Sequence, residues 1–264
     1  MNKLEKLLEI DLEKESNRII KFIREIITET KSNGIVVGIS GGVDSALVTV
    51  LCVKAIGPEK VFGVMLPLDF TPKQDLDDAI ALAKQLNIQF QILPIDSIAK
   101  SFFENLNLNM NDPSYKLAMA NIRARIRMII LYYFANLKNA LVVGTGDKSE
   151  ILIGFFTKYG DGGVDFLPIA HLYKTQVRKM AEFLGVPSHI AYKPASPQLY
   201  PGHLATDEIP IGYEKMDPVL VGLVDKKMKP DKVSKITDVS IEIINKIISK
   251  IKNSEHKRKY PKMI

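Results

Sequence analysis

Cysteine and tryptophan are nearly absent: the chain of 264 residues contains one cysteine, Cys52, and no tryptophan. A single cysteine excludes both a disulfide scaffold and a cysteine-rich zinc site. No apolar run approaches the ~18 residues that a membrane span requires, and residues 1–6 mix charges where a secretion signal would have an apolar core. We therefore expect a cytoplasmic protein with no membrane partner.

Positive charge is concentrated in one part of the chain. Residues 226–264 hold twelve Lys and Arg residues against four Asp and Glu, whereas residues 1–225 hold 24 against 26. A protein that binds nucleic acid over its whole surface would spread this charge more widely. We interpret the basic segment as a solvated helix and predict no nucleic-acid partner.

Short β-branched runs alternate with segments of helical periodicity in the first half of the chain. The predicted strands are 35–39, 61–66, 88–95 and 140–143, and the predicted helices are one or two within 4–29, then 46–56, 75–86 and 114–137. This alternation predicts an α/β fold, a doubly wound parallel sheet with flanking helices on both faces. Ligands of such sheets bind at the carboxyl ends of the strands.

The pattern changes after residue 150. Helical spacing returns at 173–184 and at 233–252, where we predict one amphipathic helix. Residues 187–218 are rich in proline and show little periodicity, which is typical of a mobile, functional segment. No repeat, linker or domain boundary is visible, so we expect one domain over residues 1–264. Cys52 lies in a segment that is apolar on all sides and is predicted to be part of the core.

The most informative segment is the glycine-rich loop Gly38–Ser45, which joins a predicted strand to a predicted helix. Its glycines allow a tight turn and a close approach of the backbone to a ligand. The N–H groups that open the next helix favour an anion, and Asp44 stands where it could hold a divalent cation that bridges phosphate oxygens. A phosphate cradle is therefore the first interpretation.

Two alternatives remain open at this point. The lysine of a Walker A loop is missing, but Gly38, Ser40 and Gly42 also match the nucleophile elbow of the α/β-hydrolases. A hydrolase would need an acid and a histidine downstream, and none of the four histidines follows a convincing strand end. The second alternative is a tight turn that binds nothing. The residues rank the elbow second and the empty turn third.

The loop Ser40–Ser45 resembles the pyrophosphate loop (PP-loop) of the ATP-pyrophosphatases, which cleave ATP to AMP and pyrophosphate. Further segments, in the same order and spacing, resemble the ammonia-dependent NAD synthetases. They are residues 121–128, 144–150, 154–163, 172–178 and 255–258. The resemblance implies a Rossmann-like fold of the adenine nucleotide alpha-hydrolase type. It also implies a single NAD synthetase domain without the amidase domain of glutamine-dependent relatives.

The resemblance implies a ligase that amidates deamido-NAD⁺ (nicotinic acid adenine dinucleotide) to NAD⁺. A carboxylate is a poor electrophile, so ATP would first convert it to an acyl-adenylate with release of pyrophosphate, and ammonia would then displace AMP. Such a site needs a pyrophosphate cradle, Mg²⁺ and cations against the developing charge. The alternatives are a GMP-forming or tRNA-modifying relative, or a nucleotide-binding module without catalysis.

The family's residue roles carry over to matching positions of this chain. The resemblance implies catalytic roles for Asp44, Glu150 and Lys174, with Asp44 and Glu150 as the Mg²⁺ ligands. The positions implied to contact ATP are Gly38, Ile39, Ser40, Gly41, Gly42, Val43, Asp44, Ser45, Thr145, Lys174 and Ser196. The positions implied to contact deamido-NAD⁺ are Arg125, Lys158, Asp165, His256 and Lys257. Asp161 and Asp165 are the candidates for accepting the proton of ammonium.

The chain departs from the family in one segment. Many members carry Pro-Ser-Ala-Gly-Leu-Trp-Pro-Gly, whereas residues 194–202 read Pro-Ala-Ser-Pro-Gln-Leu-Tyr-Pro-Gly, with two residues inserted before Asp207. We expect this loop to be mobile without ligand and ordered with ATP. The family also implies a homodimer with deamido-NAD⁺ near the subunit interface, to which helix 114–137 would contribute. Without an amidase domain, the nitrogen source is free ammonia, supplied from solution or by a separate glutaminase.

Overall fold

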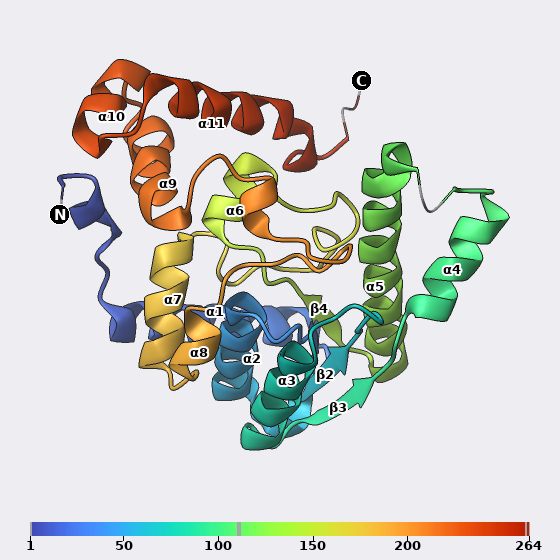
Figure 1. Ribbon diagram of the computed structural model, residues 1–264. Helices are drawn as coiled ribbons and strands as arrows, with labels where there is room; N and C mark the ends of the chain where they lie inside the picture. The colour runs from blue at the N-terminus through green and yellow to red at the C-terminus, as the bar shows by residue number, and fades with distance from the viewer. Residues whose placement is uncertain (1, 110–111, 262, 264) are drawn as a thin grey trace.

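Parallel strands form the centre of the computed structural model, which describes residues 2–109, 112–261 and 263 (Figure 1). Within this part of the chain, four strands lie in the order β3-β2-β1-β4. They are β1 (Ile35–Gly38), β2 (Val61–Met65), β3 (Gln89–Ile92) and β4 (Leu141–Val143). Ile35 pairs with Val61 on one side and with Leu141 on the other, and all pairings are parallel. The predicted doubly wound sheet is confirmed.

The helices follow the strands in alternation and then continue alone. They are α1 (Leu12–Thr30), α2 (Val43–Ile56), α3 (Lys73–Gln85), α4 (Asp96–Asn105), α5 (Lys116–Lys138), α6 (Lys148–Ile153), α7 (Lys174–Phe183), α8 (Ser188–Ala191), α9 (Tyr213–Leu220), α10 (Pro230–Thr237) and α11 (Ile241–Asn253). None of the helices in the described part of the chain combines the length and apolar character needed to cross a bilayer.

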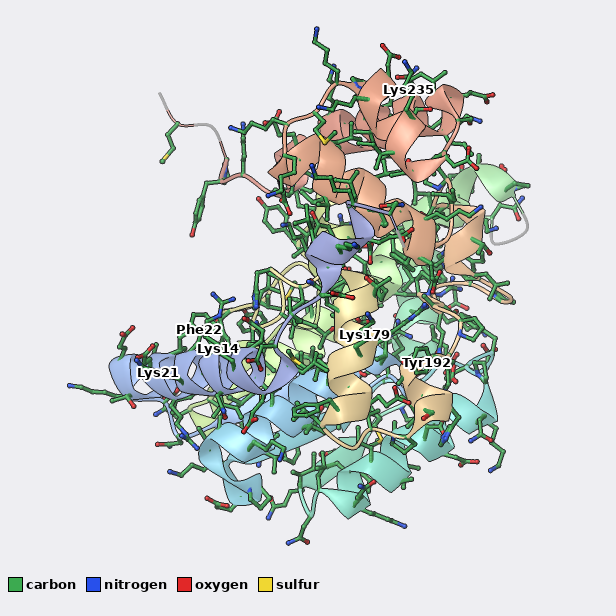
Figure 2. The ribbon with its side chains drawn as sticks, turned by 90° about the vertical axis from the view of Figure 1, so that its left-hand side faces the viewer. Lys14, Lys21, Phe22, Lys179, Tyr192 and Lys235 are labelled. Atoms are coloured by element: carbon green, nitrogen blue, oxygen red, sulfur yellow. The ribbon has the colours of Figure 1, made fainter. Side chains whose placement is uncertain are left out.

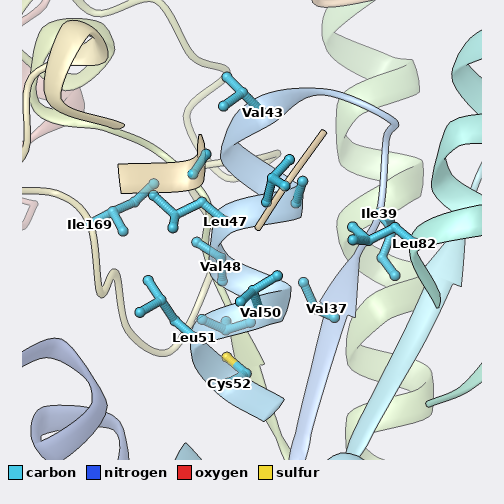
Figure 3. Close-up of a cluster of buried hydrophobic side chains, with 14 of the residues drawn as sticks. Val37, Ile39, Val43, Leu47, Val48, Val50, Leu51, Cys52, Leu82 and Ile169 are labelled. Atoms are coloured by element: carbon cyan, nitrogen blue, oxygen red, sulfur yellow. The ribbon is translucent and has the colours of Figure 1, made fainter. Parts of the chain in front are cut away.

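The strands cover both faces of the sheet with apolar side chains because successive residues point to opposite sides. Ile35 and Val37 face a cluster built from α1, α2, α3 and α7. Val36 faces a second cluster built from α4 and α5. Figure 3 shows the first cluster around α2, where Leu47 and Cys52 are fully buried. The prediction that Cys52 belongs to the core is confirmed.

The C-terminal helices form a separate layer with its own buried cluster. Met216 of α9, Val233 of α10 and Ile244 of α11 pack there against Leu4 and Leu8 from the start of the chain. In Figure 1 this layer lies above α6, which separates it from the sheet. Figure 2 labels exposed Lys235 in the layer, far from the exposed lysines of α1 at the side of the sheet. The predicted sheet therefore has a helical cap over its carboxyl edge.

The prediction of one helix at 233–252 is wrong, because α10 and α11 are separate. Asp238 ends α10 in a left-handed conformation with φ of 54°. Ser240 then begins α11 by accepting a hydrogen bond from the Ile243 amide at 3.4 Å. The apolar spacing runs across the break, and the two polar residues that make it are the only local sign of the turn. The proline-rich segment 187–218 likewise contains the short helices α8 and α9.

Candidate active site

The glycine-rich loop turns the chain sharply from β1 into α2. Gly41 has φ of 80°, and a Cβ there would come within 2.1 Å of the Asp75 carbonyl oxygen, so glycine is required on both counts. Ser45 Oγ donates to the Gly42 carbonyl at 3.0 Å and lies 3.1 Å from Ser40 Oγ. The N-cap residue of α2 is Gly42, which has no side chain to cap the helix, so the first N–H groups of α2 are available to a ligand. The loop has the construction of an anion cradle.

The nucleophile elbow is not supported by the surroundings of Ser40. In the part of the chain that the structure describes, no hydrogen bond joins Ser40 to a histidine. His171 pairs with Glu15 and His189 with Asp78. A serine hydrolase needs a base within hydrogen-bond reach of its nucleophile, so this alternative lacks an essential component.

The loop lies at the point where the strand order reverses. The chain passes from β1 to β2 and β3 on one side, and β4 then pairs with β1 on the other side. The ends of β1 and β4 are therefore neighbours, and Thr145 after β4 lines the same cavities as Ser40 after β1. Such a switch point is the usual ligand site of an open α/β sheet.

A buried lysine and three carboxylates lie beside the loop; we call Lys174, Asp44, Asp147 and Glu150 the lysine–carboxylate cluster. Lys174 Nζ is 2.7 Å from Asp44 Oδ2, 2.9 Å from Asp147 Oδ2 and 2.8 Å from Glu150 Oε1. Burial opposes the charge of Lys174, but the three carboxylates raise its pKa well above the ordinary value. Burial also raises the pKa of Glu150 well above its usual range and that of Asp147 to about 6.

The cluster brings together the three residues predicted to be catalytic and adds one that the motifs did not single out. Asp147 is fully buried and caps α6 by accepting a hydrogen bond from the Glu150 amide at 2.8 Å. An aspartate followed three residues later by a glutamate is a common start of a helix. This spacing was the sequence signal that could have identified Asp147.

Asp217 of α9 holds the helices that carry the cluster. It accepts hydrogen bonds from Ser149 Oγ at 2.6 Å and from the Thr175 amide and hydroxyl at 2.9 and 2.8 Å. Ser149 Oγ in turn accepts from the Lys174 amide at 3.0 Å. Because the partners lie 68 and 42 residues away along the chain, no local pattern reveals this contact.

Two cavities meet at the glycine-rich loop. The first, of about 450 Å³, has apolar walls from the end of β2 and from α5. The second, of about 610 Å³, contains the open side of the lysine–carboxylate cluster. The residues that line both include Ser40, Ser45, Thr145, Asp161, Ser196 and Lys257. The basic side chains of the second cavity are Lys158, Lys174, Arg178, Lys193, Lys257, Arg258 and Lys259. This charge suits a phosphorylated ligand.

The segment 194–208, which we call the lid loop, lies against both cavities. Its base is closed by a hydrogen bond from the Ala205 amide to the Ala195 carbonyl at 2.9 Å. Arg123 of α5 donates to the Leu199 carbonyl at 2.6 Å. Lys193, just before the loop, contacts Asp75 at 2.7 Å and the Gly41 carbonyl at 3.0 Å. These contacts fasten the loop to α3, α5 and the cradle, and its mobility without ligand stays a prediction.

The residues predicted to contact deamido-NAD⁺ do not all reach the cavities. Lys158 and Lys257 line the second cavity, whereas Arg125, Asp165 and His256 line neither. The Asp165 carboxylate accepts hydrogen bonds from the Val142 amide of β4 at 2.7 Å and from the Tyr132 hydroxyl at 3.1 Å. Arg125 is exposed on α5 and His256 is exposed after α11.

The basic residues near the C-terminus bind backbone carbonyls at the C-terminal end of α6 and just after it. Lys257 Nζ donates to the carbonyls of Gly154 and Phe156 at 2.8 and 2.7 Å. Arg258 donates to the carbonyls of Ile151 and Leu152, in the last turn of the same helix, at 3.0 and 2.8 Å. Cations are favoured at this end of a helix. Arg258 belongs to the motif 255–258, but the sequence implied no role for it.

The fold and the site define an α/β nucleotide-binding protein whose anion cradle adjoins an acidic cluster at the switch point of a parallel sheet. The sequence model of the NAD synthase family matches residues 15–261. The chain belongs to the NAD synthase family, as the motifs predicted, and the enzyme class is a ligase that forms a carbon–nitrogen bond.

Similar proteins support this assignment over nearly the whole chain. A protein of Staphylothermus marinus named NH(3)-dependent NAD(+) synthetase is 48% identical over 256 residues, covering 97% of this chain and 92% of that protein. The NH3-dependent NAD synthetase structure of Campylobacter jejuni has a TM-score of 0.81 at 31% identity and covers 97% of this chain and 100% of that one. The NMN synthetase structure of Francisella tularensis has a TM-score of 0.84 at 29% identity, with coverage of 97% and 99%.

Proposed function

We propose that this protein makes NAD⁺ from deamido-NAD⁺, ATP and ammonia, with release of AMP and pyrophosphate. The observation that carries the proposal is the meeting of two cavities at the cradle, where Ser40, Ser45 and Thr145 line both. A reaction between ATP and a second nucleotide needs two binding spaces that meet at the phosphorus under attack. The family and the names of the similar proteins do not favour a GMP-forming or tRNA-modifying enzyme.

In the first step, a carboxylate oxygen of the nicotinate ring bonds to the α-phosphorus of ATP, and the bond from that phosphorus to pyrophosphate breaks. Negative charge therefore develops on the leaving pyrophosphate. The first N–H groups of α2 and the hydroxyls of Ser40 and Ser45 are suited to stabilise this charge. Lys174 is a buried cation close to the cradle, because its ammonium lies 2.7 Å from Asp44 Oδ2 at the start of α2.

In the second step, the ammonia nitrogen bonds to the acyl carbon, AMP leaves with the former carboxylate oxygen, and one proton passes to a base. Asp161 is the better placed of the two candidates, Asp161 and Asp165, for accepting this proton. Asp161 lines both cavities and accepts a hydrogen bond from the Thr157 amide at 2.7 Å. Asp165 lines neither, and its carboxylate is bonded to β4 and α5.

The acidic residues fit a magnesium ion that accompanies ATP. In the described part of the chain, no group of three or more metal-binding side chains is arranged around an open centre, because Lys174 lies among the carboxylates. Mg²⁺ needs only one or two carboxylates beside phosphate oxygens and water. Asp44 Oδ1 is buried without a hydrogen-bond partner, so Asp44 and Glu150 are the residues that would hold the ion. It would supply charge neutralisation for the phosphates.

The proposed nitrogen source is free ammonia. The chain spans 92% of the ammonia-dependent relative from S. marinus and 100% of the ammonia-dependent structure from C. jejuni. The names of these two proteins support the proposal that the described chain uses free ammonia. A separate glutaminase that delivers ammonia is compatible with it.

A second copy of the chain would give a role to Arg125 and His256, which line neither cavity. Arg125 lies on α5, whose Ile129, Tyr133 and Leu137 recur at helical spacing with exposed fractions of 55–68%. An exposed apolar stripe of this kind is typical of an interface. We propose a homodimer through α5 that brings Arg125 and His256 to the deamido-NAD⁺ site. A protein that is monomeric by light scattering and retains full activity would contradict the proposed homodimer.

Pyrophosphate release measured with ATP, Mg²⁺ and deamido-NAD⁺ tests the proposed function. We expect release and NAD⁺ formation with ammonium and neither with glutamine. Lys174→Met should abolish release, whereas the matched control Lys148→Met should not, because Lys148 pairs with Asp225 outside both cavities. Tight ATP binding without release would contradict the proposal. Nicotinate mononucleotide is the comparison substrate, because a similar structure is named NMN synthetase.

A further inference from the structure

His203 is a buried side chain of the lid loop with one nitrogen that has no partner. It lines the first cavity and is 3% exposed. Its Nε2 lies 2.7 Å from Glu208 Oε1. Its Nδ1 is buried, and no atom in the described part of the chain bonds to it. A buried polar atom without a partner lowers stability, so an atom of this kind facing a cavity indicates a ligand group that completes it.

The partner of Nε2 determines what Nδ1 can bind. An ionised carboxylate only accepts hydrogen bonds, so the Nε2 that faces Glu208 carries the proton. In the neutral ring, Nδ1 then presents a lone pair. For the neutral ring, the group that completes the contact is therefore an N–H or O–H donor.

The ring of His203 is held in a fixed orientation. It stacks on Tyr200 with the ring centres 3.7 Å apart and the planes inclined by 14°. Lys116 Nζ lies 3.6 Å from the centre of the Tyr200 ring, and Ser196 Oγ donates to the His203 carbonyl. These contacts reduce the conformational entropy that the side chain would lose on binding.

We propose that His203 is a nucleotide-binding residue whose Nδ1 accepts a hydrogen bond from ATP. The proposal rests on the proposed function and adds that the nucleoside of ATP lies in the first cavity, which joins the cradle to apolar walls such as Val64 and Ala120. Outside its triphosphate, ATP carries two kinds of donor, the amino group of adenine and the hydroxyls of ribose. If the donor is the amino group, His203 makes the enzyme select adenine over bases with a carbonyl at that position.

Calorimetric titration of the full-length protein with ATP and Mg²⁺, without a second substrate, tests this role independently of turnover. His203→Phe keeps a ring for the stack on Tyr200 but removes both nitrogens. We expect it to weaken ATP binding by about tenfold, the loss expected for one hydrogen bond in a buried site. The matched control is His189→Phe, which removes a histidine paired with Asp78 outside both cavities and should leave ATP binding unchanged.

Analogues of ATP distinguish the two donors. Inosine and purine riboside triphosphates lack the amino group, and 2′-deoxy-ATP and 3′-deoxy-ATP each lack a hydroxyl. If the donor is the amino group, the wild-type protein should bind both base analogues about tenfold more weakly than ATP. If the donor is a hydroxyl, the affinity should fall by the same factor for the analogue that lacks it. His203→Phe should show no further loss of affinity for the same analogue. Equal binding of ATP and every analogue by the wild type would overturn the proposal, and so would losses that multiply in the variant.

The analogue series uses the wild-type protein, so the proposal stays testable if His203→Phe fails to fold. ATP binding that is unchanged in a folded His203→Phe would mean that water, not the nucleotide, completes Nδ1. In that outcome the inference fails while the proposed function stands. No ATP binding by the wild type would instead refute both.

Discussion

Replacement of Lys174 with methionine should destabilise the protein and expose its carboxylates to added cations. Methionine preserves the apolar stem but removes the ammonium, which lies 2.7–2.9 Å from three carboxylate oxygens and is nearly inaccessible to solvent. Removal of one partner from a buried ion pair costs about 3–5 kcal/mol. For a chain of this size, that loss corresponds to a fall in Tm of roughly 10 °C.

The response to Mg²⁺ separates this effect from ordinary loss of packing. If Asp44 and Glu150 hold Mg²⁺ as proposed, Lys174 competes with the ion for them in the wild-type protein. In Lys174→Met, the carboxylates have no other cation, so Mg²⁺ should raise the Tm of the variant more than that of the wild type. A ligand at a hundredfold its Kd stabilises by about 2.7 kcal/mol, which would restore more than half of the loss.

The assay is thermal unfolding followed by circular dichroism, with and without millimolar Mg²⁺. The control is Lys148→Met, whose ion pair with Asp225 is partly exposed and should contribute about 1 kcal/mol or less. An equal Mg²⁺ effect on wild type and Lys174→Met would refute the reasoning, because the carboxylates would then not form the cation site. An unchanged Tm in Lys174→Met would refute the energetic argument itself.

Two further substitutions and one labelling experiment have defined outcomes. Gly41→Ala adds a Cβ at φ of 80° and 2.1 Å from a carbonyl oxygen, so urea unfolding should register a loss of more than about 1 kcal/mol and ATP titration should register weaker binding. Asp217→Ala leaves the hydroxyls of Ser149 and Thr175 without their acceptor. We expect urea unfolding to show a loss of about 1–3 kcal/mol in the free energy of unfolding, together with a lower kcat for pyrophosphate release. An unchanged kcat would contradict the positioning role of Asp217. Burial raises the pKa of the Cys52 thiol, so a thiol reagent should react only after denaturation, and rapid labelling of the native protein would disprove its burial.

The sheet could be predicted because its signals are local. The run from Ile35 to Val37 is β-branched and followed by glycines, and the structure buries its side chains on both faces. The division of the last helix could not be predicted as easily. Apolar residues keep their helical spacing from Val233 to Ile247, while α10 ends at Asp238 in a left-handed backbone conformation. Periodicity reports which residues face a core, and two helices that face one core continue the same period.

The candidate site divides along the same line. Motifs identified Asp44, Glu150 and Lys174, and the structure places Lys174 within hydrogen-bond distance of both carboxylates although 130 residues separate it from Asp44. The motifs did not identify Asp217, which orients them. Its partners lie 68 and 42 residues away, and nothing in its immediate neighbours along the chain distinguishes it from an ordinary surface residue.

The charge of the site implies that the nucleotide and its cation bind together. Three carboxylates share the single ammonium of Lys174 beside a loop built for an anion. The seven basic side chains of the second cavity attract a bare triphosphate, but beside the cradle its charge would meet the carboxylates of the cluster and be opposed by them. If Asp44 holds a divalent cation as proposed, the cation would offset this local repulsion, and each ligand should strengthen the binding of the other by the same factor. The cluster would then favour ATP that arrives with its metal.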